Sequence, residues 1–166
     1  MQTTQDLMND VLFFANSDNA DRRKRFEDVF CETWELIPLE YRQDILDHLE
    51  FILCKNVEDA YQNGTPACCH ICSISLKSFI IWNPYIGFLE QKTQVHVLAH
   101  ELCHVYYNHP YTGFCFNDRK KEKVFIDTEA EPQAYKLTVD WGILPDEEDI
   151  FKLRGWRKYV LHEEGL

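Results

Sequence analysis

Glycine and proline are scarce in this chain, with only six of each in 166 residues. Flexible linkers and low-complexity segments are usually rich in these residues, and no internal repeat is visible either. The length fits one domain. We therefore expect residues 1–166 to form a single domain, with a helical N-terminal part over 1–60 and the core of the site over 65–145.

Positive charge is also in short supply. Lys and Arg number 17 against 28 Asp and Glu, which gives a formal net charge of −11. A strongly acidic protein is repelled by phosphate backbones and by anionic membrane surfaces. Neither nucleic acid nor a membrane is therefore predicted as a partner.

Long hydrophobic runs are absent, and none approaches the ~18 residues that a membrane-spanning helix needs. The first residues, MQTTQD, show no basic segment followed by an apolar one, so a secretion signal is not predicted. The seven cysteines are an odd number, which favours reduced thiols over a disulfide framework. We accordingly expect a cytoplasmic protein.

Apolar residues recur at helical spacing in several segments and at strand-like spacing in others. Helices are predicted over 5–15, 21–36, 39–54, 90–108, 128–141 and 146–162, strands over 68–75 and 78–82, and a loop over 111–126. Pro110 should end the fourth helix, because the residue before a proline disfavours helical geometry. Helices that flank a small sheet indicate an α+β fold.

The chemistry of the chain centres on an H-E-x-x-H motif, formed by His100, Glu101 and His104. Residues four apart lie on the same helix face, so both imidazoles can bind one metal ion. Glu101 lies about 60° from His104 in projection at 3.6 residues per turn, close enough to take a proton from a metal-bound water without being a ligand. The motif therefore predicts zinc as cofactor and Glu101 as general base.

A catalytic zinc ion needs a third protein ligand from elsewhere in the chain. The metzincin pattern would place a histidine ten residues after His100, but that position is Pro110, and His109 is one residue short. The alternative is a carboxylate on a following helix. Residues 127–135, DTEAEPQAY, contain two glutamates that could serve, Glu129 and Glu131.

Two stretches, FIIWNPYIGFLEQKTQVHVLAHELCHVYYNH and EAEPQAYKLTVDWG, resemble the ImmA/IrrE-type metallopeptidases and related minimal gluzincins. The resemblance covers about residues 65–145 and implies a small zincin-like domain, with a short sheet packed on the H-E-x-x-H helix and a glutamate-bearing helix after it. It implies His100, His104 and Glu129 as zinc ligands. Gln133 would replace the family's Asp or Asn that orients a ligand histidine.

The two glutamates two residues apart point about 160° away from each other on a helix. Glu129 shares a face with Gln133, as the family pattern requires, whereas Glu131 can form a capping box with Thr128. Pro132 departs from the pattern, and it is tolerated only in a helix's first turn. The helix is therefore expected to begin between Thr128 and Glu131.

The predicted function is that of a zinc-dependent peptidase acting on a peptide or protein. The resemblance implies a specific regulatory protein as the substrate. The strand at 78–82 should flank the cleft, and a substrate could join the sheet as an extra strand. Two alternatives remain. One is a zinc-binding interaction or sensing module whose catalysis is weak or lost through Pro132 and Gln133. The other is a helical interaction protein without zinc. The sequence does not predict the oligomeric state.

Several other residues have simpler interpretations. Cys68, Cys69, His70 and Cys72 lack zinc-finger spacing and fit buried thiols in a strand. His96 is expected to be a partly exposed helix residue and Cys103 a core residue. Four tyrosines could stabilise an oxyanion, and the sequence does not choose among them: Tyr106, Tyr107, Tyr111 and Tyr135.

Overall fold

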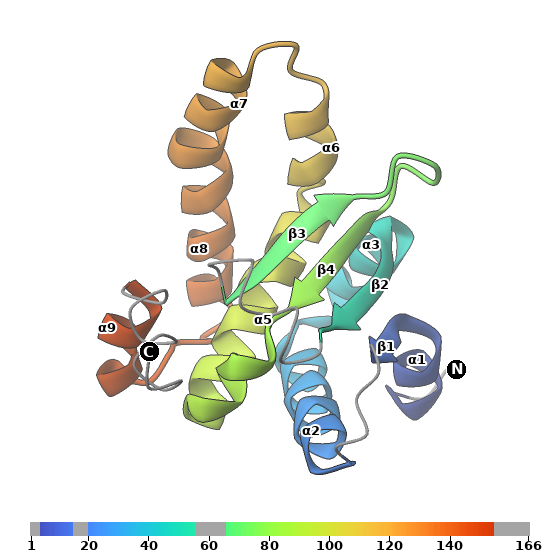
Figure 1. Cartoon of the computed structure of the whole chain (residues 1–166), viewed down its shortest axis with the longest axis vertical. Helices are drawn as coiled ribbons and strands as arrows, with labels where there is room; N and C mark the ends of the chain where they lie inside the picture. Colours follow the sequence, from blue (N-terminus) through green and yellow to red (C-terminus); the bar gives the residue numbers. More distant parts are fainter. Residues whose placement is uncertain (1–3, 15–19, 56–65, 155–166) are drawn as a thin grey trace.

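The computed structural model describes residues 4–14, 20–55 and 66–154. Figure 1 shows helices gathered around a four-stranded sheet. In chain order the elements are α1 (Thr4–Val11), β1 (Leu12–Phe14), α2 (Ala20–Leu36), α3 (Leu39–His48), β2 (Leu49–Cys54), β3 (Ala67–Ile71), β4 (Ser78–Trp82), η2 (Pro84–Phe88), α5 (Gln91–Tyr106), α6 (His109–Phe114), α7 (Arg119–Phe125), η3 (Ile126–Ala130), α8 (Glu131–Asp140), η4 (Glu147–Asp149) and α9 (Ile150–Arg154).

The sheet is mixed, with strand order β1-β2-β4-β3. The first three strands in this order are parallel, and β3 runs antiparallel to β4 at one edge. Ile80 on β4 is paired with Ile52 on one side and with Cys69 on the other. The predicted α+β class is confirmed, and the strand predicted over 78–82 has those bounds.

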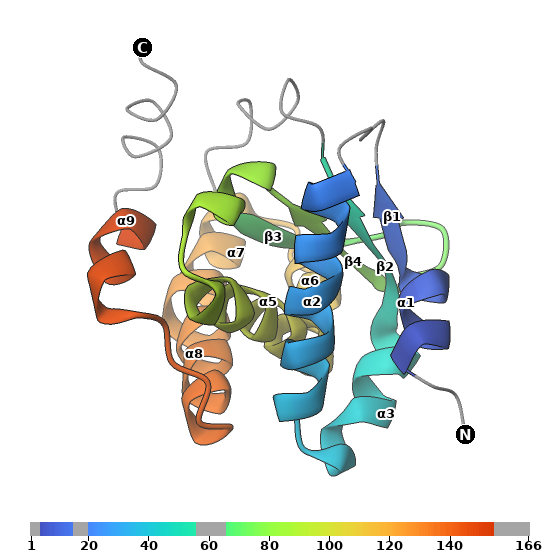
Figure 2. The ribbon, with the colours of Figure 1, turned by 90° about the horizontal axis from the view of Figure 1, so that it is seen from below.

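The core lies between one face of the sheet and the helices α2 and α5. Ile52 and Ile80 from the sheet are fully buried, as are Leu98 and Leu102 from α5. Figure 1 shows α5 running behind the sheet, and Figure 2 shows it between α8 and α2. The motif helix is thus held on several sides, and burial of its apolar residues fixes the direction in which its polar face points.

The N-terminal part differs from the prediction, because two of its predicted helices end early and continue as strands. The segment expected as a helix over 5–15 is α1 followed by β1, and the one over 39–54 is α3 followed by β2. A short apolar run such as Leu49–Cys54 fits a buried strand as well as a buried helix, since periodicity alone does not separate them. The apolar character of these strands suits a parallel arrangement.

The C-terminal half holds more helix than predicted. The expected loop over 111–126 is wrong, because α6 and α7 occupy most of it. The helical run of α5 ends at Tyr106, before Pro110, and the backbone turns at Asn108. Contrary to the prediction, His109 is helical, because Pro110 lies in the first turn of α6, where proline is well tolerated. Within the helix predicted over 146–162, the structure shows η4 and α9, and residues 155–162 lie outside the described part.

The helix predicted to begin between Thr128 and Glu131 is α8, which begins at Glu131 but follows directly on other helical turns. From Arg119 to Asp140, α7, η3 and α8 follow one another directly, and η3 is a π-helical turn. The ring of Pro132 would clash with the carbonyl of Thr128 in a regular α-helix. A wider π turn just before Pro132 removes this conflict, and such turns are frequent at functional sites.

Candidate metal centre

The helix α5 presents both histidines of the motif on one side. His100 and His104 lie one turn apart, and His104 is buried while His100 is half-buried. Residues on the far side of the helix are fully or almost fully buried, including Val95, Leu98 and Leu102. The two imidazoles therefore lie on the side of the helix opposite these core residues, as their spacing in the sequence predicts.

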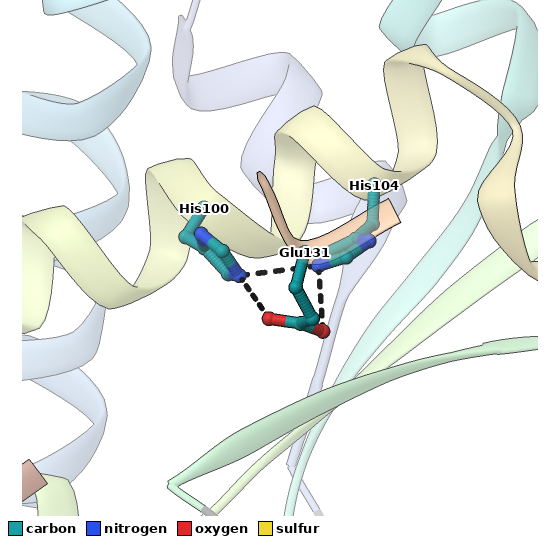
Figure 3. A group of neighbouring side chains, drawn as sticks. All are labelled: His100, His104 and Glu131. Carbon is teal, nitrogen blue, oxygen red and sulfur yellow. Dashed lines mark hydrogen bonds and ion pairs between the residues drawn. The ribbon is translucent and has the colours of Figure 1, made fainter. Parts of the chain in front are cut away.

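A carboxylate from α8 completes a compact group with the two imidazoles, as Figure 3 shows. The Nε2 atoms of His100 and His104 are 3.1 Å apart. Glu131 approaches His100 with Oε2 at 3.2 Å and His104 with Oε1 at 3.4 Å. Among the described residues, these three form a group of potential ligands whose donor atoms all lie within 4.8 Å of one another.

The spacing of these atoms would allow one small metal ion to contact all three side chains. Two ligand atoms bonded at 2.0–2.1 Å to a tetrahedral centre lie about 3.3 Å from each other, and the two Nε2 atoms are 3.1 Å apart. The carboxylate meets the two imidazoles with different oxygens, Oε2 at 3.2 Å and Oε1 at 3.4 Å. Two imidazole nitrogens and one carboxylate are also a donor set that zinc accepts. The residues present therefore fit a small divalent ion with a fourth position left open.

The third member of the group is Glu131, whereas the sequence favoured Glu129. The packing of α8 on α5 explains the difference. Ala134, Leu137 and Thr138 are the buried residues of α8, and Ala134 and Thr138 lie against Cys103 of α5. Glu131 lies three residues before Ala134 and seven before Thr138, on the same helix face. Glu129 lies five residues before Ala134, so it is turned away. We therefore replace Glu129 by Glu131 as the candidate ligand.

The capping box predicted between Thr128 and Glu131 is absent because Thr128 lies inside the helical run and not at its start. The hydroxyl of Thr128 donates to the carbonyl of Val124 at 2.7 Å, one turn earlier in the same helical run. The Glu131 side chain is instead occupied by the two histidines.

The charge on Glu131 is stabilised by its neighbours. Hydrogen bonds with His100 and then His104 hold the pKa of the Glu131 carboxyl well below its usual range. Burial pulls the pKa of His100 down, but the hydrogen bond to Glu131 and the nearby negative charges raise it overall. Both shifts favour an ion pair between a protonated His100 and an ionised Glu131.

Glu101 lies beside this group without being part of it. It is buried, and burial raises the pKa of its carboxyl, while the adjacent histidines and a hydrogen bond from the backbone N–H of Cys69 lower it. Cys69 belongs to the edge strand β3. The carboxylate of Glu101 therefore lies between the metal group and the edge of the sheet.

A chain of hydrogen bonds connects His104 to His109 and Gln133. Its Nδ1 is 2.9 Å from Nδ1 of His109, whose Nε2 is 3.1 Å from Oε1 of Gln133. An amide oxygen only accepts, so the proton of a neutral His109 lies on Nε2, and its Nδ1 accepts from His104. This arrangement leaves the lone pair of His104 Nε2 facing the metal group.

Gln133 was expected to orient a ligand histidine directly, and the structure places His109 between them. His109 is buried at the start of α6, and burial is the main reason that its pKa is lowered. The chain reverses at Asn108, which has the left-handed φ of 54°. Asparagine tolerates this geometry better than most residues. The Asn-His-Pro sequence after the motif is therefore the local feature that could have indicated a turn bringing His109 toward His104.

The group opens into a cleft of about 590 Å³. The edge strand β3 forms one side, from Ala67 to Ile71, and α6, α7 and η3 contribute Phe114, Phe125 and Ile126 opposite. The strand predicted to flank the cleft, 78–82, is β4, which lies inside the sheet between β2 and β3. The strand that flanks it is therefore β3.

The cysteines are placed outside the metal group, within the part of the chain that the structure describes. Cys68 lies 3.1 Å from Nε2 of His70, and burial raises the pKa of Cys69. Cys103 is a core residue as expected. Burial raises its pKa to about 12, and its sulfur is 3.3 Å from the Thr138 hydroxyl.

His96 differs from the expectation of a partly exposed residue. It is buried, and its Nδ1 donates to the carbonyl of Ile143 at 3.0 Å. Of the four tyrosines, Tyr106 packs on Tyr41, and Tyr107 stacks on His109. Tyr135 packs edge-on against His96.

The chain was compared with protein-family models, with curated proteins and with solved structures, and none of them matches it. In the described ranges, no helix is both long enough and apolar enough to cross a membrane.

Proposed function

We propose that this chain is a zinc-dependent metallopeptidase in which His100, His104 and Glu131 hold the ion. The observation that carries the proposal is the close group of two imidazoles and one carboxylate, whose ligand atoms all lie within 4.8 Å of one another, because this is a donor set that zinc accepts. The resemblance of the motif region to ImmA/IrrE-type peptidases supports it. Zinc would polarise a substrate carbonyl and lower the pKa of a bound water.

Glu101 is the general base of the proposed reaction. Its carboxylate lies next to the two ligand histidines, where it can take a proton from the attacking water and pass it to the leaving amine. The position between the metal group and β3 suits this task, because a peptide lying along β3 brings its scissile bond to that place. The substitution Glu101→Gln would keep the shape of the side chain and remove the carboxylate that accepts the proton.

The substrate is a peptide segment in extended form. An edge strand such as β3 offers main-chain hydrogen-bonding groups to which a peptide can add as a fifth strand. The opposite side of the cleft is apolar, with Phe114 and Ile126 partly exposed to it. We infer a single regulatory protein as the natural source of this segment, by resemblance to the family, and a cytoplasmic site of action.

The test compares the full-length protein with Glu101→Gln and with the control Glu129→Gln. All three should bind about one zinc per chain by elemental analysis. In a peptide-library assay read by mass spectrometry, wild type and Glu129→Gln should cleave at the same sites, and Glu101→Gln should not. Cleavage by Glu101→Gln at the wild-type rate contradicts the assignment of the base.

A second candidate function is a zinc-binding interaction module without catalysis. Gln133 favours it, because a neutral amide at the end of the His104–His109 chain raises ligand basicity less than a carboxylate does. Zinc-loaded wild type that cleaves no peptide in the library would support this function. Absence of zinc after metal-replete purification would contradict both.

A further inference from the structure

A second cavity, of about 160 Å³, lies at the end of the sheet where the three parallel strands finish. The last residues of β1, β2 and β4 all line it, namely Phe14, Cys54 and Trp82. In open sheets, ligands bind in the crevice outside the carboxyl ends of parallel strands. The cavity shares none of its described lining residues with the metal-site cleft.

The inner wall of this cavity is made of packed aromatic rings. Phe26 and Trp82 are both buried, and their ring centroids are 4.9 Å apart. Tyr85 is buried as well, and Phe88 at the rim stacks on it with centroids 6.0 Å apart. Such a wall favours a flat apolar group, because rings pack on one another in offset or edge-on contact.

The rim of the cavity is cationic. Arg22 and Arg25 from the start of α2 line it together with Lys55, which follows β2. No Asp or Glu occurs among the described residues that line it, although the whole chain carries a net charge of −11. Within the part of the chain that the structure describes, three positive side chains therefore border an apolar floor.

We propose that this cavity binds a small aromatic anion, a compound of one or two fused rings that bears a carboxylate or a similar acidic group. The rings lie on Phe26 and Trp82, and the acidic group meets the cationic rim. The volume is several times the ~30 Å³ that a water molecule occupies in the liquid, yet smaller than the ~300 Å³ at which drug-sized pockets begin. The proposal is independent of the zinc site.

The test uses 2-naphthoate and its neutral analogue 2-naphthamide as probes, titrated into the ¹⁵N-labelled full-length protein. Naphthoate should shift amide signals around the cavity and bind at least about tenfold more tightly than naphthamide, because hydrogen bonds to a charged group are the stronger ones. Equal binding of the two probes overturns the proposal, as does a shift pattern confined to other parts of the chain.

Variants distinguish binding by the cationic rim from general attraction of the probe to positive charge. Replacing Arg22, Arg25 and Lys55 together by Gln should weaken naphthoate at least about tenfold and leave naphthamide unchanged. Lys24→Gln is the matched control, since Lys24 is on the same helix, pairs with Asp28 and does not line the cavity. An equal loss of naphthoate affinity in Lys24→Gln would show that the rim acts only through general attraction to positive charge, and it would contradict the proposal.

A blocking variant tests the apolar floor without touching any charge. Gly87 lines the cavity, and a Cβ added there meets no atom within 4 Å. Gly87→Leu should therefore fold, as checked by its thermal unfolding, and abolish naphthoate binding by filling the space. Unchanged binding in a folded Gly87→Leu protein would place the probe elsewhere and overturn the proposal.

Discussion

At the scale of single residues, the choice between two glutamates decides whether the centre can hold a metal ion. Glu131 approaches both ligand histidines at 3.2 and 3.4 Å, whereas Glu129 lies on another face of the same helical run. Only a carboxylate that reaches both imidazoles can share an ion with them. The two positions therefore form a matched pair for mutation, with the same chemistry and different geometry.

We predict that Glu131→Ala lowers zinc affinity at least ~10-fold, since losing a ligand should cost no less than losing a supporting residue. Glu129→Ala should bind zinc as wild type does. Titration against a competing chelator measures both affinities. The reverse result, with zinc lost from Glu129→Ala and kept by Glu131→Ala, would contradict the ligand set.

The hydrogen-bonded chain from His104 through His109 to Gln133 also makes a prediction at this scale. Gln133→Leu removes the acceptor that fixes the His109 tautomer, and zinc affinity should fall about 10-fold. Gln133→Glu supplies a charged acceptor and should bind zinc more tightly than Gln133→Leu and at least as tightly as wild type. The cobalt-substituted protein should show a changed visible spectrum in Gln133→Leu.

The control for this chain is Gln43→Leu, because Gln43 is an exposed glutamine whose side chain pairs with Asp47 on α3. It should leave both zinc affinity and the cobalt spectrum unchanged. Wild-type zinc affinity in Gln133→Leu would show that the chain does not orient His104.

At the scale of elements, the start of the motif helix is anchored by a residue far along the chain. Asp149 is fully buried and accepts from the backbone N–H of Glu90 at 2.8 Å, while Lys152 pairs with it at 2.6 Å. The N–H groups at a helix start lack partners inside the helix, and a carboxylate there also suits the helix dipole. The segment that follows α8 thus contacts the N-terminal end of α5.

Burial raises the pKa of Asp149, but the bonds from Lys152, Glu90 and Thr93 outweigh it and lower the value overall. A folded-state pKa below the unfolded one gives stability that is present above the ordinary value of 3.8 and is lost as the pH falls through the folded-state value. Asp149→Ala should therefore cost about 1–3 kcal/mol at pH 7, and this difference should shrink in acid.

Urea unfolding of wild type and Asp149→Ala at pH 7 and near pH 3 measures this difference. Glu148→Ala, one residue away and exposed, is the control and should change stability by less than about 0.5 kcal/mol. A difference that stays constant between the two pH values would exclude the carboxylate charge as its source.

At the scale of the whole molecule, the candidate centre joins two halves of the fold. The histidines come from α5, which packs on the sheet, and Glu131 comes from α8, which packs on the other side of α5. An ion bound by both helices binds the folded chain alone, because the unfolded chain does not hold its ligands together. Metal binding should therefore appear as stability of the whole domain.

We expect zinc at 100 times its dissociation constant to stabilise the protein by about 2.7 kcal/mol. For a domain of this size, 1 kcal/mol raises the melting temperature by about 2–4 °C, so the shift should be about 5–10 °C. Differential scanning calorimetry with zinc and with a chelator measures it. Glu131→Ala should show a much smaller shift, and an equal shift would place the ion elsewhere.

Local periodicity alone determined the part of the site that lies on one helix. The spacing of His100 and His104 places them on one face, and the apolar residues between and around them turn that face away from the core. The strand at 78–82 was predicted for a similar reason, because its β-branched and aromatic residues fit a buried strand wherever it pairs.

Only the tertiary structure decided which residues meet those two histidines. Whether Glu129 or Glu131 faces them depends on the rotation of α8 about its axis. That rotation is set by the packing of Ala134 and Thr138 on α5. It also depends on the π turn before α8, which no local sequence pattern predicted. His109 reaches His104 because the backbone reverses at Asn108. Such choices arise from contacts between segments far apart in sequence, where the energy of packing outweighs local preference.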